Sequence, residues 1–123
     1  MTTPLENLGE VADVHVASAA AGAARATPGV ERLQPGLWGL VQQLSHELWE
    51  RATGEAYPDV AGVEVELQDG VALVDVTLAT DGTIPAGQVA AAVQRAVVDA
   101  VAARTAVSVL SVAVHVCEIA LPR

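Results

Sequence analysis

The stretch from Gly62 to Leu78 constrains the fold more than any other part of this 123-residue chain. It reads Gly-Val-Glu-Val-Glu-Leu-Gln-Asp-Gly-Val-Ala-Leu-Val-Asp-Val-Thr-Leu, so apolar and polar residues alternate on both sides of Asp69 and Gly70. Alternation with a period of two predicts strands with one buried face, and Asp-Gly is a preferred two-residue hairpin turn. The stretch therefore predicts an antiparallel β-hairpin with one apolar face and one polar face.

The register of this hairpin follows from its turn. A two-residue turn places Gln68 opposite Val71, and the other pairs follow by counting outward. The predicted pairs on the apolar face are Leu67 with Ala72, Val65 with Val74, and Val63 with Val76; those on the polar face are Glu64 with Asp75, and Glu66 with Leu73. A slip of one residue would bury the acids, so we expect the register to be well specified.

A helix and a last strand are predicted after the hairpin. The helix opens at Ile84 and Pro85 and runs to Arg104, because Pro is favoured at the start of a helix. Its valines recur every four residues and should lie on the sheet: Val89, Val93, Val97 and Val101. The last strand runs from Val107 to Ile119, and its alternation points one set of residues to one face: Leu110, Val112, Val114 and Val116.

The N-terminal third is predicted to be helical after a polar, frayed lead-in over residues 1–10. A helix from Asp13 to Ala26 ends at Thr27-Pro28-Gly29, although Val14 and Val16 also permit a short strand. Val30 to Gln34 is expected to be a short connection.

A second helix is predicted from Pro35 to Gly54, because leucines and a valine form an amphipathic stripe along it. Trp38 and Trp49 flank that stripe. They lie either at the edge of the core, the more common place for Trp, or on an exposed interaction patch.

These elements predict one small two-layer α+β domain over residues 11–123, with the order α-α-β-β-α-β. A three-stranded sheet, made of the hairpin and the C-terminal strand, carries the helices on one face. We expect the last strand to lie beside the first strand of the hairpin, on the side away from the second.

Composition excludes several classes of function. The chain has 15 acidic and 6 basic residues, and its net charge of −9 repels nucleic acids and anionic membrane surfaces. Its single cysteine, Cys117, excludes an intrachain disulfide and a Cys-based zinc site. No apolar segment is long enough to span a membrane, and no signal peptide is visible, so we expect no direct membrane insertion.

The polar face of the sheet is the sharpest candidate site. Glu64, Glu66, Asp75, His115 and Cys117 could meet there, and carboxylates with an imidazole resemble a divalent-cation site or an acidic active site. A solvated acidic surface is the more common meaning of such a cluster. We predict no catalytic, cofactor-binding or metal-binding residue, and take the acids and His115 as candidate interaction residues.

The order of several short motifs resembles the alkaline shock protein family, the envelope or general stress proteins of Gram-positive bacteria. The matching motifs are Thr27-Pro28-Gly29-Val30, Gly62-Val-Glu-Val, Asp69-Gly70, Val74-Asp75-Val76, Gly82-Thr-Ile-Pro85 and Val112-Ala-Val114-His-Val116. The resemblance spans most of residues 12–118. The chain departs from the family at Asp81 and Ala86, where an aromatic residue and an acid are common, and in the length of its second helix.

The resemblance implies a non-enzymatic, cytoplasmic protein that needs no cofactor and is linked to cell-envelope stress. It also implies self-association into a homo-oligomer and binding to a protein partner, such as a membrane-anchored paralogue that holds the protein at the membrane. Two alternatives stay open: a small KH-like nucleic-acid-binding module, and a metal-binding or enzyme domain that uses the acidic face. A KH-like module would need a basic Gly-x-x-Gly loop, which the sequence lacks.

Overall fold

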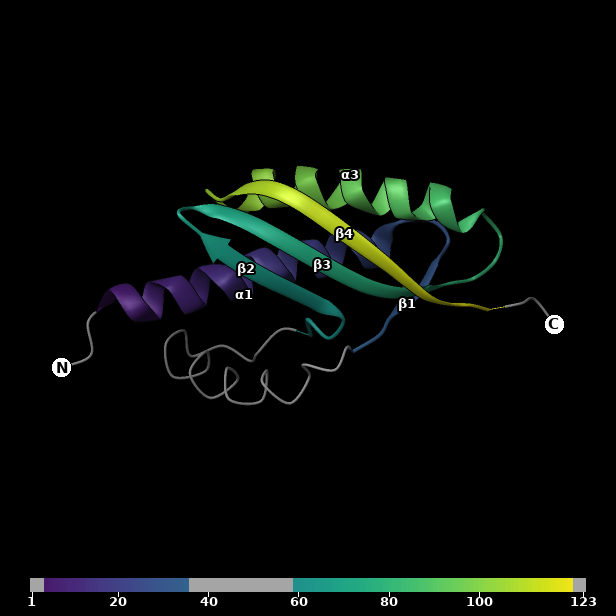
Figure 1. Cartoon of the computed structure of the whole chain (residues 1–123), viewed down its shortest axis with the longest axis horizontal. Helices are drawn as coiled ribbons and strands as arrows, with labels where there is room; N and C mark the ends of the chain where they lie inside the picture. Colours follow the sequence, from purple (N-terminus) through teal and green to yellow (C-terminus); the bar gives the residue numbers. More distant parts are fainter. Residues whose placement is uncertain (1–3, 36–58, 121–123) are drawn as a thin grey trace.

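A mixed four-stranded sheet with two helices on one face makes up the described part of the chain, which is residues 4–35 and 59–120 of a computed structural model (Figure 1). The elements follow one another in the order α1 (Pro4–Ala26), β1 (Val30–Leu33), β2 (Val63–Gln68), β3 (Val71–Thr80), α3 (Ala86–Arg104) and β4 (Ser108–Ile119). The predicted α+β class is confirmed. The predicted helix from Pro35 to Gly54 lies almost entirely outside the described residues.

The predicted hairpin is confirmed pair by pair. β2 and β3 are antiparallel, with Gln68 opposite Val71 and Glu64 opposite Asp75. Asp69 and Gly70 both have positive φ, 53° and 78°. This is the conformation that a type I′ turn needs, and Asp-Gly adopts it at low cost. The two-residue turn and the alternation therefore fix the same register.

The predicted place of the last strand is wrong. β4 pairs with β3 rather than with β2, and the pairing is parallel. Along β3, β2 pairs with residues 71–76 and β1 continues beside residues 78–80, while β4 pairs with residues 71–80. β3 is thus the central strand. β3, α3 and β4 form a βαβ unit, in which the connection through α3 places β4 directly beside β3.

The predicted connection from Val30 to Gln34 contains a strand, so the sheet has four strands rather than three. β1 pairs antiparallel with the end of β3, Leu33 opposite Leu78, with an irregular register between Val30 and Arg32. β2 is shorter than β3 and leaves this end of β3 without a partner on the side away from β4. Because unpaired backbone groups are costly, the four residues of β1 complete the ladder there.

The core consists of small aliphatic side chains between the helices and the sheet. The predicted valine stripe of α3 is confirmed, because Val89, Val93, Val97 and Val101 are all buried. α1 contributes buried alanines, among them Ala20 and Ala24, which let its backbone approach α3 and the sheet closely. Burial of each valine stabilises the fold by roughly 1.5–3 kcal/mol.

α1 begins at Pro4, nine residues before the predicted start at Asp13. It ends where the sequence predicts. The Thr27 hydroxyl donates to the Ala23 carbonyl oxygen at 2.8 Å, and Gly29 turns the chain into β1 with a φ of 90°. The domain boundary at residue 11 stays a prediction.

Two irregularities in the β3–β4 ladder change which residues of β4 are buried. They lie between Ala72 and Leu73 and between Leu78 and Ala79 on β3, and they leave Leu110 and Cys117 without an opposite residue. Leu110 was predicted to share the face of Val112, but its side chain is 72% exposed, whereas Val112 is buried. A β-bulge re-aims the side chain of its extra residue, and the alternation in a sequence does not reveal it.

Candidate functional site: the outer face and free edge of the sheet

The sheet face opposite the helices, called the outer face here, brings Glu64, Asp75 and His115 together. Glu64 on β2 lies opposite Asp75 on the central strand, and His115 on β4 lies opposite Thr77. The His115 Nε2 and Asp75 Oδ1 atoms are 3.2 Å apart, and both side chains are about half exposed. Two carboxylates directly opposite each other repel, and His115 offsets this repulsion when it is protonated.

The other two residues of the predicted cluster have different contacts. The Glu66 carboxylate accepts a hydrogen bond from the Gln68 side-chain amide at 2.8 Å. The Cys117 Sγ lies 3.1 Å from the Gln34 Oε1 and 3.2 Å from the Leu78 carbonyl oxygen. Within residues 4–35 and 59–120, no three His, Cys, Asp or Glu side chains are placed to hold a metal ion. The described outer face therefore holds a half-exposed Asp75–His115 contact with separate acids around it.

β4 forms one edge of the described sheet, and α3 covers part of that edge. In the described part of the chain, β4 pairs with β3 alone. The Gln94 side-chain amide on α3 donates to the Val112 carbonyl oxygen at 2.9 Å. Figure 1 shows that α3 runs beside the first half of β4, and that the two diverge toward the C-terminal end of the strand.

The C-terminal half of β4 combines an exposed apolar side chain with a compensated charge. Ile119 is 51% exposed. Glu118, the acid of this strand, accepts a hydrogen bond from the Arg32 guanidinium at 2.5 Å. This contact raises the pKa of Arg32, and Glu31 also lies beside the same guanidinium. The half-strand therefore presents backbone groups and an aliphatic side chain with little net charge.

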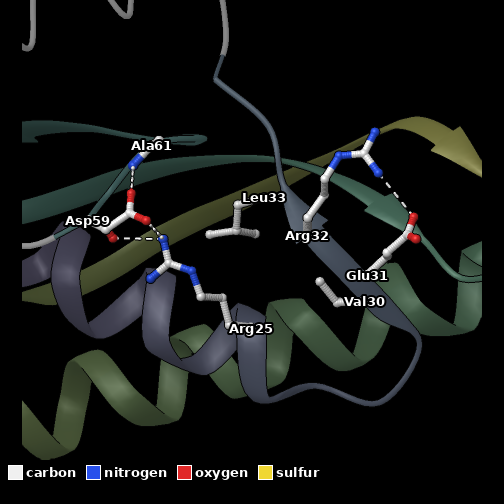
Figure 2. A pocket seen from close by; sticks show the side chains of 7 residues that line it. All are labelled: Arg25, Val30, Glu31, Arg32, Leu33, Asp59 and Ala61. Carbon is white, nitrogen blue, oxygen red and sulfur yellow. Dashed lines mark hydrogen bonds and ion pairs between the residues drawn. The ribbon is translucent and has the colours of Figure 1, made fainter.

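An open pocket of about 340 Å³ lies where the end of α1, β1 and Asp59 meet (Figure 2). The Arg25 guanidinium contacts Asp59 through its carboxylate at 3.3 Å and through its carbonyl oxygen at 2.8 Å. On the other side, Arg32 pairs with Glu31, and Leu33 lies between the two pairs. Both cations are already paired with carboxylates, so the pocket offers no evident binding group for an anion.

Sequence reasoning missed Gln94, Arg32, Leu110 and Ile119. Gln94 and Arg32 contact strands that are distant in the sequence, and nothing in the local sequence shows which strand either side chain reaches. The exposure of Leu110 depends on a bulge. A signal for Ile119 was present, because a β-branched residue at the end of a long strand beside an acid has little to cover it. Trp38 and Trp49, two predicted interaction residues, lie outside the described residues.

No helix in the described part of the chain is long and apolar enough to cross a membrane.

One comparison identifies a family. A family model described as the alkaline shock protein 23 family, with a cell envelope-related function, matches residues 6–121. No curated protein and no solved structure matches the chain. The match covers nearly the whole chain and contains every described strand.

Proposed function

Because the chain belongs to the alkaline shock protein family, whose function is related to the cell envelope, we propose that it is a non-enzymatic assembly protein of that envelope. In this role it associates with copies of itself and binds a protein partner. The partner, a membrane-anchored protein, holds it on the cytoplasmic side of the membrane. The family match and the resemblance of the sequence motifs support this role.

The observation that carries the proposal is the exposed aliphatic surface of β4. Leu110 and Ile119 are the two most exposed large hydrophobic side chains of the described residues, at 72% and 51%. Both lie on a strand that pairs with β3 alone in the described sheet. A strand edge without a partner that carries exposed aliphatic side chains is a template for pairing with another chain.

Charge supports a protein partner over a nucleic acid. The net charge of −9 repels a phosphate backbone, and Arg25 and Arg32 are both paired with carboxylates. The acids of the outer face, Glu64 and Glu66, suit a partner that carries lysines or arginines. Trp38 and Trp49 remain candidate contact residues for the same partner.

Light scattering over a wide range of protein concentration tests the self-association. The mean mass should rise with concentration above the 12.6 kDa of one chain. Ile119→Lys should weaken the rise, because it places a charge on the exposed surface of β4. Gln68→Lys, an exposed position at the end of β2 with the same change in charge, serves as the control. A mass of one chain at every concentration would contradict the proposal.

A further inference from the structure

The outer strands of the described sheet differ in charge. β2 carries two acids, Glu64 and Glu66, whereas the acid of β4 is Glu118, which the Arg32 guanidinium binds. In a chain with a net charge of −9, two copies repel each other at most contacts. The edge of β4 is a surface where a second copy meets little uncompensated negative charge.

The two halves of this edge also differ. In the N-terminal half, Gln94 occupies the Val112 carbonyl oxygen, and α3 lies alongside. A second strand joined there would have to compete with Gln94 for the Val112 carbonyl oxygen. In the C-terminal half, from Val114 to Ile119, β4 and α3 diverge (Figure 1). The backbone of α3 therefore does not run alongside this half.

We propose that two copies of the chain join their sheets by antiparallel pairing of Val114–Ile119 of β4 around a two-fold axis. The proposal rests on the self-association proposed above and specifies its geometry. A strand edge presents backbone donors and acceptors that a second strand satisfies. A two-fold axis makes the contact self-complementary, because each residue meets on the partner the residue that it contacts in return.

The side chains of this segment fit the arrangement. Centred on the middle of the segment, antiparallel pairing brings Glu118 of one copy near His115 of the other and keeps the two Glu118 carboxylates apart. A histidine ring N–H can donate a hydrogen bond to a carboxylate across two strands. The pairing also covers Ile119, which is half exposed in the single chain.

Cys117 provides a natural reporter, because it is exposed, lies within the paired segment and is the single cysteine of the chain. With any centre between Val114 and Ile119, the two Cys117 Cα atoms lie within about 20 Å of each other at 3.3 Å per residue. A nitroxide label on Cys117 should therefore show strong dipolar coupling at concentrations where light scattering detects dimers. Dilution with unlabelled chain should remove the coupling.

Two variants of the unlabelled chain test the segment without a label. Ile119→Lys should raise the dissociation constant by about tenfold or more, because a charged side chain enters the interface. Val98→Lys is the matched control, since Val98 is another exposed aliphatic residue, 42% exposed, but lies on α3. It should leave the dissociation constant within about twofold of the original.

The outcomes separate this geometry from self-association itself. Coupled Cys117 labels together with selective weakening by Ile119→Lys would support the pairing. Dimers whose Cys117 labels are much farther apart than about 20 Å would overturn the pairing but leave self-association in place. A chain that stays monomeric at every concentration would overturn both.

Discussion

The Gln94 side-chain amide on α3 donates a hydrogen bond to the Val112 carbonyl oxygen on β4 at 2.9 Å. This contact ties the helix to the strand that follows it and occupies a backbone acceptor of the edge strand. It lies in the N-terminal half of β4, beside which α3 runs, whereas the C-terminal half diverges from α3 (Figure 1). The stability of the domain and the association proposed above therefore involve the same strand.

Replacement of Gln94 with Ala should destabilise the domain by about 1 kcal/mol, because a partly buried backbone acceptor loses its donor. Urea denaturation measures this change. Gln88→Ala is the control, since Gln88 is an exposed glutamine at the start of the same helix. Equal losses of stability in the two variants would show that the Gln94 contact contributes nothing of its own.

Gly29→Ala should be among the most damaging small substitutions, with a loss of about 2 kcal/mol or more. The φ of Gly29 is 90°, and a Cβ there would lie 2.6 Å from the Val89 Cγ2, inside the core stripe of α3. Gly87→Ala, in the first turn of α3, meets open space and should stabilise the domain by about 0.5–1 kcal/mol. Thermal unfolding of both variants tests this opposite pair of signs, and a stable Gly29→Ala protein would contradict the packing of Gly29 against α3.

Glu64→Gln should stabilise the domain slightly, by about 0.2–1 kcal/mol, because it removes one of two carboxylates that face each other across β2 and β3. Glu66→Gln is the matched control, since Glu66 lies opposite Leu73 rather than an acid. Chemical denaturation at neutral pH compares the two. A cation or a basic partner that needs Glu64 would reverse the sign in its presence, and a calorimetric titration with zinc, manganese or calcium would detect such a cation.

The pKa of Asp81 lies below its usual range because the Thr83 hydroxyl and backbone N–H both donate to its carboxylate. The charged form is therefore the one that the fold stabilises. The contribution of the charged Asp81 to the stability of the fold is present above the unfolded-state pKa, near 4. It is lost as the pH falls through the lower folded-state pKa. Thr83→Ala should raise the pKa of Asp81 toward its usual value, and Thr83→Ser should keep it low. Carboxyl NMR titration measures both, and an unchanged pKa in Thr83→Ala would contradict the role of the hydroxyl.

The hairpin and α3 could be predicted in detail because their patterns are local. A slip of the hairpin would bury Glu64 and Asp75, so the sequence has one acceptable register. In α3, the four-residue spacing of the valines leaves one apolar stripe. Neither prediction needs knowledge of another element.

The strand order and β1 could not be predicted, since both depend on lengths that only the assembled sheet reveals. β3 pairs along all of Val71–Thr80, which is longer than β2, and this excess creates the place for β1. β1 itself is four residues long with Glu31 and Arg32 at its centre, too short and too charged to show alternation. The exposure of Leu110 follows from a bulge, and bulges leave no periodic signal.

The sequence placed Asp75 and His115 on the same polar face but did not predict that they contact each other. The contact forms even though β4 lies beside β3 rather than β2, because β3 lies between β2 and β4 and carries Asp75 within reach of both. Glu66 and Cys117 make other contacts, and Cys117 is the residue that the second bulge of β4 takes out of the alternation.

Amide hydrogen exchange at low and high protein concentration tests the central claim, association through the open half of β4, most directly. Association should slow the exchange of amides in Val114–Ile119, because a second strand accepts from them, while Glu64 and Glu66 on β2 should keep their rates. Unchanged exchange in β4, over a concentration range in which the mass of the protein rises, would contradict the claim.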